Sequence, residues 1–217
     1  MKTIENLIRI HEGEEALIIC AGSSVKEYQP MIKNFIRDKE PFTIGVNNIT
    51  DLFIPKYHLY TNTSRFRTYG YKISNKSEVL LSYGINSKLI KQNLGNREYT
   101  IINFTDMKEG VPLGYKKGKI YGFFRTAGCL SIMIAHLMGA KKIYIAGMDG
   151  HTFHNFEDVK NGSKQHHCYD ENYEPFPKDI CIKKDKIVSG VLSNLKEYGI
   201  NFQILTPTFY SEYYGGF

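Results

Sequence analysis

Short runs of hydrophobic residues, each followed by a turn, recur along the chain and alternate with stretches of helical spacing. The runs at 16–20 and 142–147 are apolar on both faces and too short for a helix, which is typical of central parallel strands. Further strands are predicted at 42–46, 57–60, 78–81, 99–102 and 202–205. Because strands alternate with helices, the sequence predicts a single doubly wound, mainly parallel sheet of the Rossmann-like α/β class, with helices on both faces.

Helical spacing of apolar residues predicts helices at 3–12, 25–38, 127–138 and 185–198. A hydroxyl side chain, from Ser23 or Ser24, is expected to cap the helix that begins at residue 25. From that helix the side chains of Met31, Phe35 and Ile36 are expected to face the core.

The chain of 217 residues is long enough for one sizeable hydrophobic core. No internal repeat, low-complexity tract or linker interrupts the pattern, so residues 1–217 are predicted to form a single nucleotide-binding domain. The Gly/Lys-rich stretch 108–119 and the polar stretch 150–185 are predicted to be loops. The second of them is long enough to act as a lid over a site.

The formal net charge is +6, but the lysines are scattered and form no basic stripe interleaved with aromatic residues. Nucleic acid is therefore not an expected partner, whereas a phosphorylated small molecule or an anionic membrane surface would be attracted. No apolar run reaches the roughly 18 residues that span a bilayer, and the first residues lack the apolar core of a signal peptide. A cytoplasmic location is predicted, with peripheral contact at the inner membrane surface as an alternative. Formation of a homo-oligomer stays open.

The four cysteines, at 20, 129, 168 and 181, have no Cys-x-x-Cys spacing. That arrangement favours buried free thiols over a zinc site or a redox pair.

The loop Ala21-Gly22-Ser23-Ser24 follows the first predicted strand and has the composition of a phosphate site. A glycine lets the backbone approach a ligand closely, and the following helix N-terminus offers N–H groups and partial positive charge. The loop matches neither Gly-x-Gly-x-x-Gly nor a P-loop. The sequence therefore predicts a phosphorylated ligand at Gly22, Ser23 and Ser24, with a plain capped turn as the alternative.

Asparagines end two neighbouring predicted strands: Asn47 and Asn48 follow one, and Asn62 follows the next. An amide carries both donors and an acceptor, which suits the edge of a nucleobase or the hydroxyls of a sugar. Turn capping is the alternative, because asparagine favours turns.

Arg125, Thr126, Ala127 and Gly128 open a predicted helix and form a second candidate anion site. Arginine grips phosphate through two parallel hydrogen bonds, and a small-residue helix start leaves room for it. The alternative is a capped helix that packs closely on the sheet.

Asp149 ends the second buried run and is followed by His151, His154, His166 and His167. Asp149 could bind a metal ion, orient a ribose or act as a base. A histidine titrates near neutral pH and is a candidate general base, but no pair has the His-x-x-x-His spacing of a helical zinc site. Solvated loop histidines are the alternative.

Several of these motifs together resemble a broad superfamily that includes the small bacterial CMP-sialic-acid-dependent sialyltransferases. It also includes the archaeal 6-hydroxymethylpterin diphosphokinase-like proteins (the DUF115 group), often encoded among surface-polysaccharide genes. The motifs are Gly22-Ser23-Ser24-Val25-Lys26, Gly-Val-Asn-Asn at 45–48, Tyr-Thr-Asn-Thr-Ser at 60–64, Thr126-Ala127-Gly128 and the run 139–149.

The resemblance to the sialyltransferases implies that CMP phosphate lies near Gly22, Ser23 and Ser24. It also implies that Asn47 and Asn62 contact the nucleotide sugar, and that residues 126–128 line the cytidine side. The chain departs from the family pattern at several places. Ala21 and Ser23 replace an asparagine and a proline, Ala127 replaces a serine, and Ile182 stands where the catalytic histidine aligns. Tyrosines expected after the aspartate are replaced by His151 and by Phe156 or a residue near it.

Together these observations predict a nucleotide-sugar-dependent, sialyltransferase-like transferase in cell-surface glycan biosynthesis, with a glycan or small-molecule acceptor. His151, His166 or His167, with Asp149, would supply the catalytic groups, and no cofactor is firmly implied. The alternatives are a pyrophosphokinase that needs Mg²⁺ and a nucleotide-binding domain without catalysis. The nucleobase, the acceptor and the choice of histidine stay open.

Overall fold

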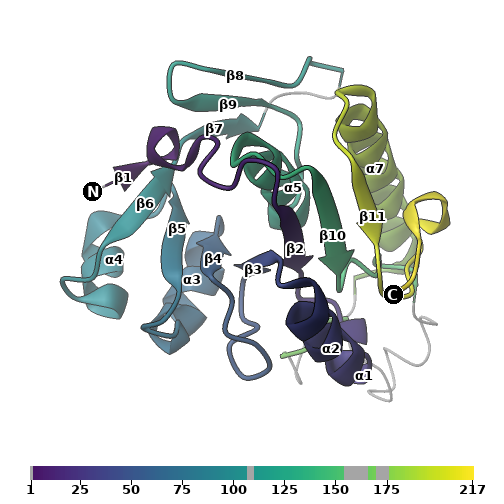
Figure 1. Ribbon diagram of the computed structural model, residues 1–217, viewed down its shortest axis with the longest axis horizontal. Helices are drawn as coiled ribbons and strands as arrows, with labels where there is room; N and C mark the ends of the chain where they lie inside the picture. Colours follow the sequence, from purple (N-terminus) through teal and green to yellow (C-terminus); the bar gives the residue numbers. More distant parts are fainter. Residues whose placement is uncertain (1, 107–109, 154–165, 170–175) are drawn as a thin grey trace.

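The computed structural model describes residues 2–106, 110–153, 166–169 and 176–217 (Figure 1). Within these residues the main sheet has eight strands, all paired in parallel, in the order β1-β6-β5-β4-β3-β2-β10-β11. The strands are β1 (Lys2–Thr3), β2 (Glu15–Ile19), β3 (Phe42–Val46), β4 (Tyr57–Tyr60), β5 (Glu78–Ser82), β6 (Tyr99–Ile102), β10 (Lys142–Ala146) and β11 (Phe202–Ile204). The predicted α/β class and all seven predicted strands are confirmed.

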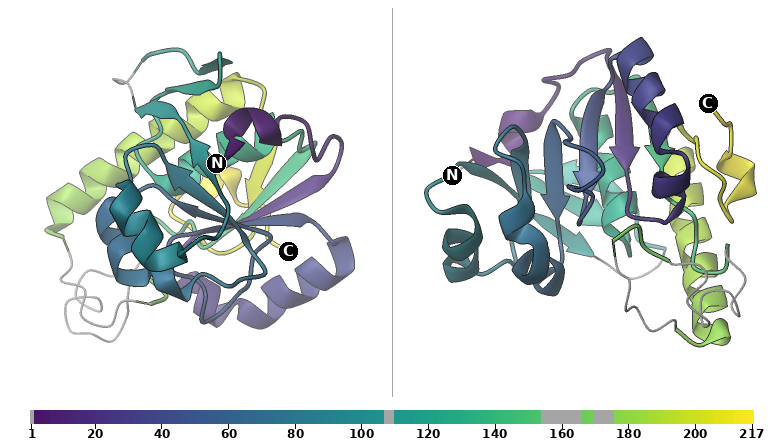
Figure 2. Two further views of the ribbon diagram at one scale, coloured as in Figure 1. Left: turned by 90° about the vertical axis from the view of Figure 1, so that its left-hand side faces the viewer. Right: turned by 90° about the horizontal axis from the view of Figure 1, so that it is seen from below.

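Helices cover both faces of this sheet (Figures 1 and 2). They are α1 (Ser24–Glu27), α2 (Gln29–Lys39), α3 (Thr63–Tyr69), α4 (Ser87–Leu94), α5 (Ala127–Leu137) and α7 (Lys178–Glu197). Short 3-10 turns are η1 (Ile4–Leu7), η2 (Gly70–Lys72) and η3 (Ser211–Tyr213). In β2, Ala16 and Ile18 pack with α5 and α7, whereas Leu17 and Ile19 pack with α1 and α2. This two-sided burial explains why the run is apolar throughout.

The predicted helix at 3–12 is wrong beyond its first turn. Instead, the backbone N–H groups of Arg9, His11 and Gly13 donate to the carbonyls of Leu137, Met138 and Gly139, at and beyond the end of α5. Arg9 adopts a left-handed φ of 57°, which ends any local helix. Alternate N–H groups of the segment therefore satisfy open carbonyls at the end of α5, and the local hydrogen bonds that remain are isolated turns, such as Glu12 N–H to the Arg9 carbonyl at 3.3 Å.

The predicted helix at 25–38 is divided in two at Tyr28, with Pro30 in the first turn of α2. Proline favours a helix start because it lacks an N–H group. The expected inward orientation of Met31 is wrong, since Met31 is 46% exposed and Ile32 is fully buried in its place. Phe35 and Ile36 are partly buried against the core, as expected.

The two predicted loops contain regular structure. Residues 108–119 include β8 (Gly114–Lys116), which pairs with β9 (Lys119–Gly122) and, through it, with β7 (Phe104–Asp106). The stretch 150–185 already contains the first part of α7, which begins at 178 rather than 185. Residues 154–165 and 170–175 of that stretch lie outside the described residues.

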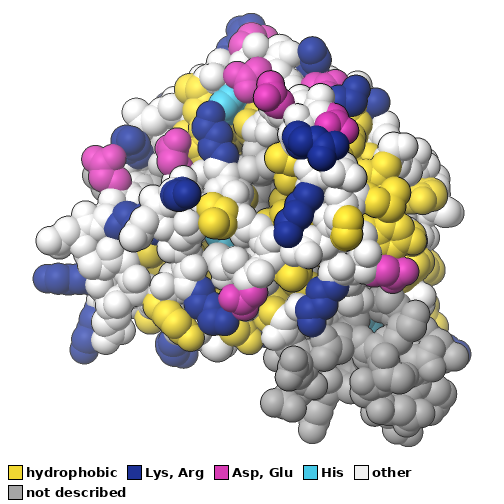
Figure 3. Space-filling model, turned by 60° about the horizontal axis from the view of Figure 1, so that its bottom comes forward, with side chains coloured by type: hydrophobic (Ala, Val, Ile, Leu, Met, Phe, Trp, Pro, Cys, Tyr) yellow, Lys and Arg dark blue, Asp and Glu magenta, His cyan; other side chains and the backbone are white. Residues whose placement is uncertain are grey.

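None of the helices in the described part of the chain is long and apolar enough to cross a membrane. On the face shown in Figure 3, Lys and Arg side chains are scattered among hydrophobic and uncharged ones. The four cysteines are buried free thiols, as the sequence predicts.

Candidate functional site

The strand order reverses between β2 and β10, because the chain builds the sheet outward from β2 in one direction and then from β10 in the other. Ligands of open α/β sheets bind beyond the carboxyl ends of the strands at such a point. A cavity of about 150 Å³ lies there, at the ends of β2, β3 and β10, beside the start of α5. The site predicted from the sequence is thus placed at the topological switch point.

Most of the predicted site residues line this cavity. They are Gly22, Asn47, Thr126, Ala127, Gly128, Asp149, His151, His166 and His167. Ser23, Ser24, Asn62 and Arg125 are not among its lining residues. His154 lies outside the described residues.

Asp149 occupies the helix start at which the sequence predicts a phosphate. Its Oδ2 accepts a hydrogen bond from the Ser24 N–H at 2.9 Å, and its Oδ1 accepts one from Ser24 Oγ at 2.5 Å. The side chain of Asp149 is almost fully buried, at 4% exposure. A carboxylate of the protein itself therefore supplies the negative charge at the start of α1. Neither serine caps that helix through its side chain, contrary to expectation.

Gly22 is needed for a close approach, but the approach is to the neighbouring strand end. A Cβ atom at Gly22 would lie 2.4 Å from the carbonyl oxygen of Gly147 and 2.6 Å from Cγ of Asp149. The Gly22 N–H also donates to that carbonyl at 2.9 Å. The glycine therefore lets the loops after β2 and β10 pack together. Gly22 lines the cavity as well, so its contact with a ligand stays a prediction.

Asn47 has the strongest ligand-binding features in the cavity. Its backbone is left-handed, with φ of 57°, and its carbonyl oxygen accepts a hydrogen bond from buried His58 Nε2 at 2.5 Å. Its side-chain Oδ1 is buried at the cavity, and no described residue donates to it. A buried acceptor without a donor is costly, so a ligand N–H or O–H is its natural partner.

The start of α5 is a second polar element of the cavity. Thr126 caps this helix, since its hydroxyl oxygen accepts a hydrogen bond from the Cys129 N–H at 3.1 Å. The N–H groups of the first turn give this end of the helix partial positive charge, which favours an anionic group. Arg125, in a left-handed conformation with φ of 60°, is exposed just before the helix.

Asn62 acts as a helix cap, which is the alternative that the sequence left open. Its Oδ1 accepts a hydrogen bond from the Arg65 N–H at 3.0 Å at the start of α3. The cap explains the asparagine without a ligand.

The histidines of the cavity lie on two segments that meet there. The rings of His151 and His166 have their centroids 6.0 Å apart, and His167 stacks on Tyr169 at 5.4 Å. Residues 166–169 run beside the loop after β2: Gly22 and His167 form an antiparallel bridge, and the Cys168 N–H donates to the Ala21 carbonyl at 2.9 Å. Burial lowers the pKa of His151, and burial together with Arg65 lowers the pKa of His167 to about 4. Both rings are therefore neutral at pH 7.

Sequence reasoning missed Asp185, which organises the loop that carries His151. Its fully buried carboxylate accepts hydrogen bonds from the His151 and Thr152 N–H groups, both at 2.7 Å. It also accepts one from Thr152 Oγ1 at 2.6 Å and one from the cavity-lining Tyr210 hydroxyl at 3.0 Å. Asp185 lies on the buried stripe of α7 that also includes Cys181, Val188 and Leu192. A charged residue within that stripe would have been the signal, had the helix been predicted to begin at 178.

Metal binding has no candidate cluster in the described part of the chain. No three His, Cys, Asp or Glu side chains gather there in a way that could hold a metal ion.

The buried His58 makes stability depend on pH. Burial lowers its pKa from 6.5 to about 4, so below pH 6.5 the unfolded chain takes up a proton that the folded chain does not. The free energy of unfolding is expected to be highest above pH 6.5 and to fall by about 3 kcal/mol through this group as the pH drops toward 4. Urea unfolding at a series of pH values measures it. His58→Gln should flatten the slope between pH 6.5 and 4, and an unchanged slope would contradict the assignment.

No protein-family model and no curated protein matches the sequence. Among solved structures, the chain is similar to that of a mammalian sialyltransferase, with a TM-score of 0.47 and 12% sequence identity over 90% of this chain and 70% of that one. The likeness is one of fold. It gives no information on the ligand or the reaction of this chain.

Proposed function

We propose that this protein is a glycosyltransferase-like enzyme that binds a nucleotide sugar at the switch-point cavity. The observation that carries the proposal is the buried Asn47 Oδ1, which has no donor among the described residues and lies at the cavity with the start of α5. An amide acceptor suits an N–H of a nucleobase or a hydroxyl of a sugar, and a helix N-terminus suits a phosphate. A nucleotide sugar carries all of these groups.

In the proposed reaction a histidine of the cavity is the general base. It takes the proton of the acceptor hydroxyl while the hydroxyl oxygen forms a bond to the anomeric carbon of the donor. The bond from that carbon to the phosphate oxygen breaks, and the nucleotide leaves with the electron pair, stabilised by the first turn of α5. His151 and His166 are the candidates, because their rings lie near one another at the cavity.

Asp149 and Asp185 are positioning residues in this proposal. Asp149 fixes the start of α1 through Ser24, and Asp185 fixes the backbone of His151. The sequence resemblance supports a role in cell-surface glycan biosynthesis, with CMP-linked sugars as the first donors to test.

Replacing the base by glutamine is expected to lower kcat by about 100-fold or more while the affinity for the nucleotide stays unchanged. His151→Gln and His166→Gln are compared in a transfer assay, with His136→Gln on α5, outside the cavity lining, as the control. If His151 is the base, the rate should persist below pH 6.5, since burial lowers its pKa and only the neutral ring accepts a proton. Full activity in both variants would contradict the assignment of His151 or His166 as the base, whereas nucleotide binding without any transfer by the unaltered protein would favour a nucleotide-binding domain without catalysis.

A further inference from the structure

A second cavity, of about 170 Å³, lies beside the switch-point cavity. In two places along the chain, one residue lines the first cavity and the next residue lines the second. Asn47 lines the first cavity and Asn48 the second, and His167 lines the first and Cys168 the second. The backbone after β3 and the segment 166–169 therefore each contribute residues to both cavities.

Asn48 places an amide donor at this second cavity. The residue is only 2% exposed, and its Oδ1 accepts a hydrogen bond from Thr50 Oγ1 at 2.8 Å. Its carbonyl oxygen faces the Cys168 thiol, with Sγ and oxygen 3.8 Å apart. Burial raises the pKa of that thiol to about 12, so it stays protonated and able to donate. In the described part of the chain nothing accepts a hydrogen bond from Asn48 Nδ2.

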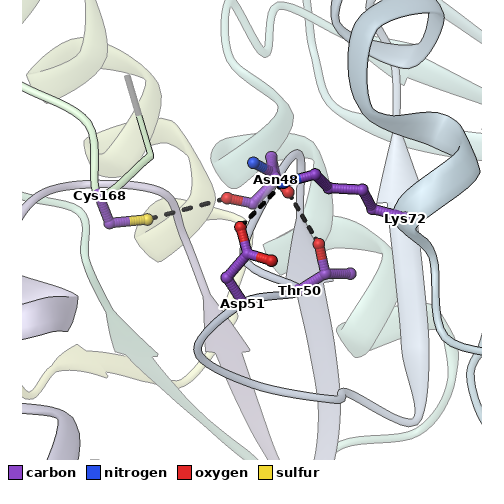
Figure 4. Close-up of polar contacts among 5 residues, drawn as sticks. All are labelled: Asn48, Thr50, Asp51, Lys72 and Cys168. Atoms are coloured by element: carbon purple, nitrogen blue, oxygen red, sulfur yellow. Dashed lines mark hydrogen bonds and ion pairs between the residues drawn. The ribbon is translucent and has the colours of Figure 1, made fainter. Parts of the chain in front are cut away.

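Asp51 supplies a carboxylate at the same cavity (Figure 4). Lys72 Nζ lies 3.1 Å from Oδ2 of Asp51, and the Asp51 side chain is 67% exposed. The carboxylate keeps acceptor positions open toward solvent. The cavity lining therefore combines an amide donor, Asn48, with a carboxylate acceptor, Asp51, and the apolar side chains of Ile49 and Leu52.

We infer that this cavity is the acceptor subsite and binds a sugar unit through two neighbouring hydroxyl groups, one donating to Asp51 and one accepting from Asn48. The inference rests on the proposed function. A hydroxyl both donates and accepts, so adjacent hydroxyls match an amide and a carboxylate that line the same cavity. An acceptor anchored here lies next to the segment that carries His166 and His167, as group transfer requires.

The test uses a panel of methyl glycosides of galactose, glucose and N-acetylglucosamine, titrated by saturation-transfer NMR with and without CMP. At least one glycoside is expected to bind, with a Kd on the order of 1 mM. Asp51→Ala should lower the affinity for that glycoside by about tenfold or more, since a hydrogen bond to a charged group is lost. Asp38→Ala, which removes an exposed carboxylate paired with Arg37 on α2, is the matched control and should leave the affinity unchanged.

Binding of CMP, CDP, UDP and ADP is measured separately and judges the proposed function alone. Asp51→Ala should leave nucleotide affinity unchanged. Failure of every glycoside to bind, or equal glycoside affinity in Asp51→Ala and the unaltered protein, would overturn the acceptor subsite even where a nucleotide binds.

Discussion

Gly22→Ala is expected to destabilise the protein by about 3 kcal/mol or more and to lower its affinity for nucleotides. The added Cβ would lie 2.4 Å from the carbonyl oxygen of Gly147, and this atom belongs to the backbone rather than to a flexible side chain. Relief requires the loops after β2 and β10 to separate. That movement would break the hydrogen bond from Gly22 to Gly147 and displace Asp149 from Ser24.

Urea unfolding of Gly22→Ala measures the effect, with Gly114→Ala as the control. Gly114 has no atom within 4 Å of the position of an added Cβ and no positive φ, so its replacement should change stability by no more than about 0.5 kcal/mol. Equal stability of the two variants would show that the two loops are not packed as described.

Asp185→Ala is expected to cost about 3 kcal/mol or more, because it leaves buried donors without an acceptor. The carboxylate accepts from the N–H groups of His151 and Thr152, from the Thr152 hydroxyl and from the Tyr210 hydroxyl. Asp185→Asn keeps one acceptor oxygen, so its free energy of unfolding should lie between those of Asp185→Ala and the unaltered protein. Either change should also loosen the backbone that carries His151.

Hydrogen exchange separates this local effect from a general loss of stability. The amide hydrogens of His151 and Thr152 should exchange faster in Asp185→Asn, relative to amides in the centre of β2. Asp179→Ala, which removes an exposed carboxylate from the first turn of the same helix, should change stability by less than about 1 kcal/mol. Unchanged exchange at 151 and 152 would contradict the role given to Asp185.

The strands could be predicted from the sequence because burial on both faces leaves a continuous apolar run. In β2 and β10, every residue after the first is buried, so the pattern needs no tertiary information. The position of the site follows from the same reasoning, since residues after parallel strands gather at one edge of the sheet. Gly22, Asn47 and Asp149, which follow β2, β3 and β10, do meet there.

The roles of individual residues at that edge could not be predicted, because they depend on partners distant in sequence. Asp149 contacts Ser24, 125 positions away, and so occupies the helix start that composition alone marks as a phosphate site. The segment 9–13 is not a helix because the N–H groups of Arg9, His11 and Gly13 bind the end of α5. The secondary-structure propensity of the local sequence gives no information on either contact.

The proposal that a nucleotide binds at the switch-point cavity is tested most directly by isothermal titration with CMP, CDP, UDP and ADP. At least one nucleotide is expected to bind. Asn47→Gly should lower the affinity for that nucleotide by about tenfold, because the substitution removes the buried acceptor and still permits the φ of 57°. Asn34→Ala, at an exposed position on α2, should bind as the unaltered protein does. Binding of none of the four nucleotides, or equal affinity in Asn47→Gly, would contradict the assignment of the cavity.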